Sequence, residues 1–294
     1  MTSPVTPDRT RPPVVPVRHY GQWITVAIVV ALLAKVIYEI AANSVIRWEV
    51  VVSRFGAEAI LQGLGVTVVL TIVSMVLGVV LGVGIAVMRI SRNRLLSAFA
   101  FGFVWLFRGT PLLVQVLVWF NLSLFLPTID LGFTVFQTNT IPPFAAAILA
   151  LALNEAAYMA EIVRGGILSV DRGQAEAAGA LGMTPGQTMA RIVLPQAMRS
   201  ILPPTGNELV TLLKETSLVS VIGAGDMLYR AQQIGATDFT RMEMLIIAAC
   251  WYLVLTTVAS VLQLWIERRF DKDRAPSAWL ARMLPLRARK EATR

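Results

Sequence analysis

The sequence predicts an all-α integral membrane protein with about six transmembrane helices. Hydrophobic residues make up 56% of the 294-residue chain, and charged residues only 15%, well below the roughly 25% typical of soluble domains. The apolar residues also gather in runs close to the ~20 residues that a helix needs to span the hydrocarbon layer. One soluble core could not bury so much apolar surface, so most of it is expected to face lipid or other apolar helices.

Six apolar runs qualify or nearly qualify as spans, at 23–43, 64–88, 109–126, 143–163, 204–224 and 244–266. A further apolar stretch, 95–107, precedes the third run, and Gly109, Thr110 and Pro111 stand between them. Glycine and proline together are expected to break a helix, so 95–107 is predicted to lie along the membrane surface before the crossing begins. Gly78 and Gly82 have the GxxxG spacing that lets helices pack closely.

Basic residues are concentrated in alternate connecting segments, which predicts the orientation of the chain. Segments rich in arginine and lysine are 1–20, 89–94, 164–200 and the C-terminal tail, whereas 44–60, 127–142 and 225–243 have few or balance them with acids. Because cytoplasmic loops carry the excess of positive charge, both termini are predicted to be cytoplasmic.

The ends of the chain differ from its apolar centre. The tails 1–18 and 271–294 are expected to be disordered or to lie on the surface, and their basic character suits anionic lipid headgroups better than nucleic acid. The first apolar run, 23–43, lacks a small-residue cleavage site, so it is interpreted as a retained membrane helix rather than a signal peptide.

The residue inventory excludes several kinds of chemistry. Cys250 is the single cysteine, which excludes an internal disulfide framework and a cysteine-built metal site. The single histidine, His19, lies in the N-terminal tail. No lysine follows the Gly-x4-Gly pattern of a phosphate-binding loop. We therefore expect no catalytic residue, no metal site and no ATPase site in this chain.

The segment 164–200 is long for a connecting loop and has the pattern of two short helices. Asp171 is an acceptable N-cap for the first, and Gly182 stands where a helix end favours a residue with positive φ. Thr184, Pro185 and Gln187 form a capping-box pattern that begins the second helix. This helix is expected to stop at Leu194-Pro195.

Motifs in and around this segment resemble those of a known family. Glu176-Ala177-Ala178, Gly182 and Ile192-Val193-Leu194-Pro195 match the EAA signature of ABC-importer permeases. Further motifs are similar to the polar-amino-acid permeases (the histidine, glutamine and arginine permease family): Gly63–Thr67, Phe107–Pro111, Asn154–Tyr158 with Glu161, Arg164–Gly166 and Lys214–Leu218. The similarity covers 60–267, so 23–43 is an extra helix before the five-helix, type I permease domain.

The resemblance implies a mechanism and a set of partners. Segment 170–195 would be the coupling loop that docks on a separate ABC ATPase subunit, through Glu176, Ala177, Ala178, Gly182, Ile192, Leu194 and Pro195. A dimer of that ATPase, using ATP and Mg, would drive alternating access in a pair formed with a second copy or a related permease. An extracytoplasmic solute-binding protein would deliver a polar amino acid. This chain would bind no cofactor and would lie in the cell membrane of a bacterium. The alternative interpretation of the loop is a short amphipathic connector.

Polar residues at membrane depth form the candidate substrate path, because ionisable groups there are costly and usually functional. They are Asn154, Glu155, Tyr158, Glu161, Lys214, Glu215, Thr216 and Ser217. A structural alternative stays open: Glu155 and Lys214 could pair, and the two hydroxyls could bond to their own helix backbone. Lys35 and Glu39 have the spacing of an intrahelical structural pair, and Arg108 is expected to mark the membrane boundary.

Two other function classes compete with the importer hypothesis. A secondary transporter or channel would work without an ATPase, and such proteins often contain an internal repeat, which this sequence does not show convincingly. A membrane scaffold or sensor would not need charges at mid-membrane depth. Co-purification with an ATPase subunit distinguishes the first hypothesis from both.

Overall fold

The computed structural model describes residues 20–130, 132, 135–138 and 141–270, so the tails expected at 1–18 and 271–294 lie outside the described residues. The chain divides into two units, Met1–Arg47 and Trp48–Arg294. In the first unit, α1 runs from Tyr20 to Ala41. Its Lys35 Nζ lies 3.7 Å from Glu39 Oε1, one turn away, which confirms the predicted intrahelical pair. Both side chains are exposed, so this pair adds little stability.

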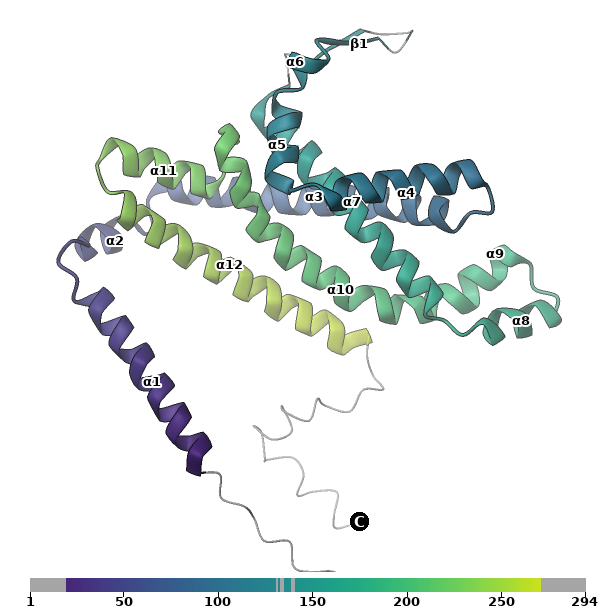
Figure 1. Ribbon diagram of the computed structural model, residues 1–294, viewed down its shortest axis with the longest axis horizontal. Helices are drawn as coiled ribbons and strands as arrows, with labels where there is room; N and C mark the ends of the chain where they lie inside the picture. The colour runs from purple at the N-terminus through teal and green to yellow at the C-terminus, as the bar shows by residue number, and fades with distance from the viewer. Residues whose placement is uncertain (1–19, 131, 133–134, 139–140, 271–294) are drawn as a thin grey trace, which may run out of the picture. The chain divides into compact units, whose positions relative to one another are not determined.

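The second unit is predominantly helical (Figure 1). Its elements are α2 (Trp48–Arg54), α3 (Glu58–Ile90), α4 (Arg94–Gly109), α5 (Leu112–Phe120), α6 (Leu122–Phe125), β1 (Thr128–Asp130), β2 (Val135–Gln137), α7 (Pro143–Leu168), α8 (Arg172–Ala180), α9 (Pro185–Thr188), the π-helix η2 (Met189–Val193), α10 (Leu194–Glu215), the 3₁₀-helix η3 (Thr216–Ile222), α11 (Met227–Thr237) and α12 (Arg241–Phe270). The two strands pair antiparallel, with Thr128 opposite Gln137.

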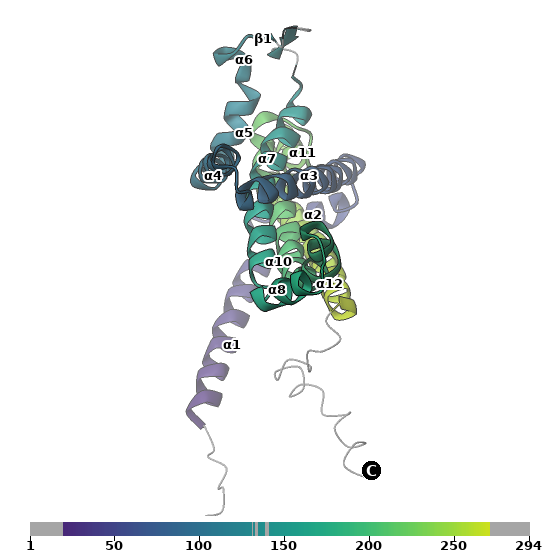
Figure 2. The same cartoon turned by 90° about the vertical axis from the view of Figure 1, so that its right-hand side faces the viewer.

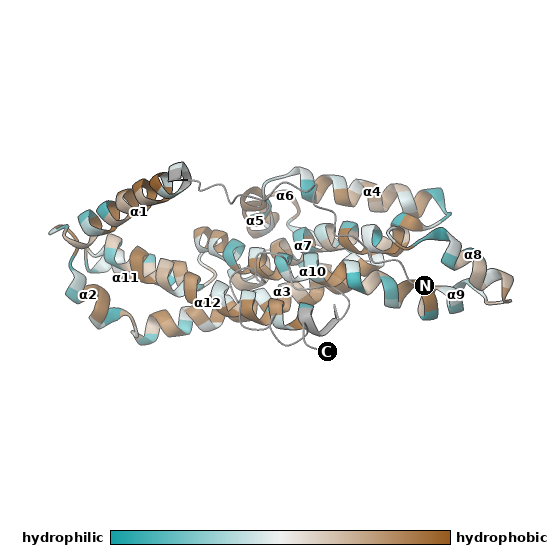
Figure 3. Cartoon of the chain, turned by 90° about the horizontal axis from the view of Figure 1, so that it is seen from below, coloured by the Kyte–Doolittle hydropathy of each residue, from teal (hydrophilic) through white to brown (hydrophobic). Residues whose placement is uncertain are grey.

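Among the described residues, fewer helices could cross a membrane than the six expected. Four helices, α1, α3, α7 and α12, are long and apolar enough to cross a membrane, and α4 with α5 adds a fifth if that bent pair counts as one span. Hydrophobic residues colour much of α1 and α3 (Figure 3). The run expected at 204–224 falls in α10 and η3, where Glu208, Lys214 and Glu215 interrupt the apolar sequence.

The break predicted around Pro111 is present. Helix α4 ends at Gly109, α5 begins at Leu112, and the two helices meet at 103°. Thr110 and Pro111 have extended backbone angles, because the proline ring disfavours helical angles in the residue before it and Pro111 has no N–H to continue the hydrogen bonds of α4. The expected span 109–126 is therefore divided between the nine-residue α5 and the single turn α6.

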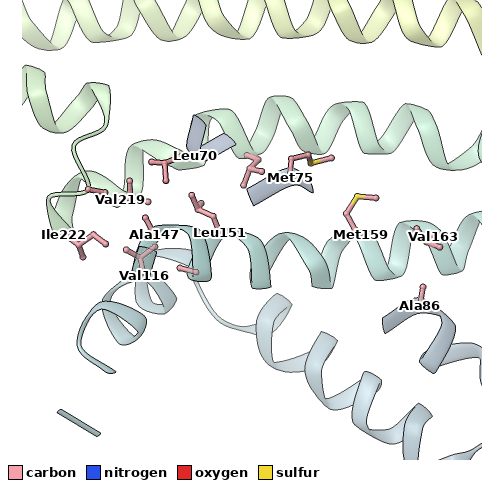
Figure 4. Packing of buried hydrophobic residues seen from close by; sticks show 14 of the residues in the cluster. Leu70, Met75, Ala86, Val116, Ala147, Leu151, Met159, Val163, Val219 and Ile222 are labelled. Atoms are coloured by element: carbon pink, nitrogen blue, oxygen red, sulfur yellow. The ribbon is translucent and has the colours of Figure 1, made fainter. Parts of the chain in front are cut away.

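The core of the second unit lies where α3 and α7 pack together. Leu70 and Met75 of α3 and Leu151 and Met159 of α7 belong to one buried cluster (Figure 4). The GxxxG glycines allow the close approach. A Cβ atom added at Gly78 would lie 2.5 Å from Glu155 Cγ. One added at Gly82 would lie 2.5 Å from Met159 Cβ, so the pattern does serve helix packing.

Several connecting segments fall at two ends of this unit, whereas α6 and β1 project separately from both (Figure 1). The α3–α4 turn and the α8–α9 segment lie at one end, whereas α2 and α11 lie at the other (Figures 1 and 2). This grouping agrees with the predicted grouping of 89–94 with 164–200, and of 44–60 with 225–243. The assignment of the first end to the cytoplasm stays a prediction.

At the second end, α2, α11 and α12 are tied together by polar contacts. Arg54 Nη1 lies 2.6 Å from Asp238 Oδ2. Trp251 Nε1 donates a hydrogen bond of 2.9 Å to the carbonyl of Phe55, and the Phe55 and Trp251 rings stack with centroids 5.0 Å apart. These contacts fix the chain that enters α3 against the start of α12.

Asp226 begins α11 from a fully buried position. Its Oδ2 accepts the N–H groups of Leu228 at 3.1 Å and Tyr229 at 3.3 Å, as an N-cap should. Next to it, Met227 N–H donates to Thr67 Oγ1 of α3 at 3.1 Å. Asp226 Oδ1 has no hydrogen-bond partner. Burial raises the pKa of Asp226 from 3.8 to about 6, despite the backbone N–H groups that favour the carboxylate.

Candidate functional site

The first helix of the 164–200 segment has the predicted ends. Asp171 Oδ1 accepts the N–H of Gly173 at 2.7 Å and so caps α8. Gly182 has φ +78°, the left-handed conformation that glycine adopts without strain. Its N–H donates to the carbonyl of Gly179 at 2.9 Å. The chain therefore reverses sharply between α8 and α9.

The second helix has the predicted start but not the predicted end. Gln187 N–H donates to Thr184 Oγ1, and Thr184 N–H donates to Gln187 Oε1, which completes the capping box. The expected stop at Leu194-Pro195 is wrong, because helical structure continues from α9 through η2 into α10. A widened turn, in which Leu194 N–H reaches the carbonyl of Met189, precedes Pro195 and lets the helix continue past a residue that has no N–H.

The residues expected to dock on an ATPase differ in exposure. Glu176, Ala177 and Gly182 are exposed, whereas Ala178 is buried in the fold of the loop itself. Leu194 and Pro195 are exposed and Ile192 is half-buried. Leu181, at the turn, has 84% of its surface exposed.

Glu155 occupies the centre of the α3–α7 contact. Its side chain is 2% exposed and packs over Gly78. Glu155 Oε1 has no hydrogen-bond partner, and the carboxylates of Glu208 and Glu215 on α10 act on Glu155 electrostatically. Glu208 also acts on Glu215, on which Lys214 acts in the opposite sense, and Arg108 acts on Glu208. Three carboxylates from α7 and α10 therefore share one electrostatic environment.

Asn154 is buried and holds the α4–α5 break in place. Its Nδ2 donates to the carbonyl of Phe107 at 3.1 Å and to Gln115 Oε1 at 3.2 Å. Gln115 Nε2 donates in turn to Phe107 O at 2.8 Å, Thr110 O at 3.1 Å and Thr110 Oγ1 at 2.9 Å. The carbonyls that lose their helical partners at the break are satisfied by these two amides.

A band of arginines surrounds Glu161 further along α7. Arg164 Nη2 lies 2.7 Å from Glu161 Oε2, and Arg89 Nε lies 3.6 Å from Glu161 Oε1. Arg108 also acts on Glu161, and its guanidinium lies 5.0 Å above the ring of Tyr158. Arg108 therefore faces Tyr158 and Glu161 of the candidate path, and its expected place at the membrane boundary stays a prediction.

Lys214, Thr216 and Ser217 lie in other surroundings. Lys214 is exposed, and none of the ion pairs within the described ranges joins it to Glu155. The pairing considered as the structural alternative is therefore not formed among the described residues. Thr216 Oγ1 donates to Leu213 O at 2.6 Å, and Ser217 Oγ donates to Lys214 O at 2.7 Å. Both hydroxyls thus bond to their own helix backbone, as that alternative also foresaw.

Two residues of this region escaped the sequence reasoning. Glu208 precedes Glu215 by seven residues, a spacing that puts both on one helix face, so the helical period could have found it. Gln115 had no such signal, because its role depends on the carbonyls that the break exposes.

Comparisons with known proteins show which family this chain resembles. Residues 74–272 match the family model of the binding-protein-dependent transport system inner membrane component. The arginine transport system permease protein ArgU of Corynebacterium glutamicum is 45% identical over 87% of this chain and 82% of its own length. The arginine transport system permease protein ArtQ of Bacillus subtilis is 41% identical over 73% of this chain and 93% of its own.

A solved structure supports the same assignment at the level of the fold. The crystal structure of an amino acid ABC transporter with histidines contains a chain 40% identical to this one. The two align with a TM-score of 0.64 over 72% of this chain and 94% of that one. The chain therefore belongs to the binding-protein-dependent transport system inner membrane components, the permease subunits of ABC importers, in which a separate subunit hydrolyses ATP.

Proposed function

We propose that this permease carries a cationic amino acid of the arginine class. The observation that carries the proposal is the group of Glu155, Glu208 and Glu215, of which Glu155 is buried and has an unpartnered oxygen. A buried carboxylate needs a cationic partner, and a guanidinium fits carboxylate oxygens with paired hydrogen bonds. Arg108, over Tyr158, is the complementary donor for the α-carboxylate. Two relatives named for arginine transport support the same substrate class.

The proposed energy source is a dimer of ABC ATPase subunits docked on segment 170–195. ATP and Mg belong to that partner, and this chain binds no cofactor. The exposed Glu176 and Leu181 support the docking role. Two permeases, as two copies or as this chain with a related one, alternate between inward-facing and outward-facing states, and a solute-binding protein supplies the amino acid. The assembly lies in the cell membrane of a bacterium, with both permease termini in the cytoplasm.

The test is substrate stimulation of ATP hydrolysis in the reconstituted complex with its binding protein. Arginine is expected to stimulate ATP hydrolysis. The Glu155→Gln variant is expected to need an arginine concentration about tenfold or more higher for half-maximal stimulation, because a buried charge pair is lost. Glu49→Gln removes an exposed carboxylate of α2 and is the matched control. Stimulation by glutamate in preference to arginine, or an unchanged response of Glu155→Gln, would contradict the proposal.

A further inference from the structure

The turn between α3 and α4 forms a shallow pocket of about 410 Å³. Its wall includes Arg89, Ser91, Arg92, Arg94, Ser97 and Phe101, and carries no aspartate or glutamate. The turn follows directly after α3, a helix long and apolar enough to cross a membrane, so the pocket is expected near the level where that span leaves the hydrocarbon layer. Three guanidinium groups beside the Ser91 hydroxyl make a site for an anion with several oxygens.

Only one of these arginines is engaged by a carboxylate of the described residues. Arg89 Nε lies 3.6 Å from Glu161 Oε1, and its guanidinium lies 4.7 Å above the Phe101 ring. Glu161 is also bound by Arg164. Arg92 and Arg94 are exposed and take part in none of the ion pairs within the described ranges. The pocket therefore keeps an excess of positive charge.

Hydrogen bonds fix the shape of the turn before any ligand binds. Asn93 Oδ1 accepts from Leu95 N–H at 2.9 Å and caps α4. Asn93 N–H donates to Ser91 Oγ at 3.2 Å, and Ser97 Oγ donates to Arg89 O at 3.3 Å. The Ser91 hydroxyl proton remains available to a ligand. A preformed site loses less entropy on binding.

The surface beyond the pocket is apolar. Along α4, Leu95, Phe99 and Trp105 are exposed by 81%, 65% and 68%, and Phe101 itself by 53%. A free phosphate ion would have no use for such a surface, whereas the acyl chains of a lipid would cover it. We propose that the α3–α4 turn binds the phosphate group of an anionic membrane phospholipid, with its acyl chains along α4.

The test measures lipid bound to the full-length protein. The purified chain in detergent is titrated with phosphatidylglycerol or with zwitterionic phosphatidylcholine, and bound lipid is counted by native mass spectrometry. Phosphatidylglycerol is expected to bind tighter. Arg92→Gln with Arg94→Gln should weaken its binding about tenfold or more, since each arginine near the headgroups contributes about 1 kcal/mol. The lysine double variant, Arg92→Lys with Arg94→Lys, should retain most of the binding.

The matched control is Arg172→Gln with Arg191→Gln, which removes equal charge from exposed positions of the α8–η2 segment and should leave binding unchanged. Equal loss in this control, or equal binding of the two lipids, would overturn the proposal. Displacement of phosphatidylglycerol by millimolar inorganic phosphate would do so too, because the site would then select a free anion. Size-exclusion profiles identify variants that fold like the wild type, and only these are compared.

Discussion

At the scale of single residues, the unusual positions of this protein are buried oxygens without partners. Glu155 Oε1 and Asp226 Oδ1 are both inaccessible and unbonded. A buried polar atom without a hydrogen bond destabilises the folded protein by about 1–3 kcal/mol, so each of these two positions needs a structural or functional explanation. Glu155 has one in the proposed substrate path. Asp226 lies at the start of α11, where its other oxygen caps the helix.

Replacement of Asp226 by asparagine should stabilise the protein at neutral pH. Asparagine caps a helix as well as aspartate does and brings no charge. Since burial raises the pKa of Asp226 to about 6, the folded wild type holds its proton more tightly than the unfolded chain, and its stability falls as pH rises from about 4 to about 6. Asp226→Asn should lack this fall and exceed the wild type by about 1–3 kcal/mol at pH 7.5.

Thermal unfolding in detergent at pH 4.5 and pH 7.5 checks this expectation. The two proteins should unfold at nearly the same temperature at the lower pH and differ at the higher. A variant that is less stable than the wild type at pH 7.5 would contradict the prediction. It would show that the carboxylate stabilises the start of α11 by more than its burial as a charge destabilises the fold.

At the scale of elements, the α3–α7 contact depends on two glycines that share one helix face. Gly82→Ala should destabilise the protein by about 1–3 kcal/mol. The added methyl carbon would lie 2.5 Å from Met159 Cβ and 2.9 Å from the carbonyl of Ala156, so the two helices would have to separate.

Gly84→Ala is the control on the same helix. Nothing lies within 4 Å of a Cβ at Gly84, and alanine is the better helix former by about 1 kcal/mol. Thermal unfolding should therefore move in opposite directions for the two variants. Equal shifts would mean that α3 and α7 tolerate a wider separation than the contact geometry implies.

Elements governed by local chemistry could be predicted from the sequence. The caps at Asp171 and Thr184, the turn at Gly182 and the break at Pro111 each depend on a few neighbouring residues. The continuous helix through Pro195 could not, because proline usually ends a helix and the widened turn that accommodates it has no sequence signature. The two amides of Asn154 and Gln115 meet only because α5 folds back on α7, a contact between residues 39 positions apart.

The candidate site, too, can be predicted from the sequence only where the signal is local. Ionisable residues stand out in an apolar sequence, so Glu155 and Glu215 can be chosen as candidates from the sequence alone, and their place in a substrate path stays a prediction. The choice between Lys214 and Glu208 as neighbours of Glu155 depends on the rotation of α10, which its mixed sequence does not determine.

At the scale of the whole molecule, the permease acts only within a complex, so reversing one loop charge should abolish transport. Glu176 is exposed on α8, and Glu176→Arg should prevent co-purification with the ATPase subunit and reduce ATP-dependent amino-acid uptake to background. A reversed charge at a docking site replaces attraction by repulsion between like charges, which costs several kcal/mol of binding free energy.

Glu49→Arg, at the opposite end of the unit, is the control and should retain the complex. Uptake that persists in cells without the ATPase would instead support the secondary-transporter hypothesis. A Glu176→Arg protein that still binds the ATPase but no longer transports would separate docking from transmission.

The unbroken helical path from α9 through η2 into α10 and η3 has a mechanical consequence. Docked as proposed, the ATPase would push on one continuous helical segment, which contains Pro203 and Pro204 within α10 and carries Glu208 and Glu215 beyond them. A movement of the loop would then be transmitted to the carboxylates as a translation or rotation of the same helical segment. The π-helix η2 and the two prolines of α10 are the places where this segment departs from regular α-helical hydrogen bonding, so they would determine how much of the movement reaches Glu208 and Glu215.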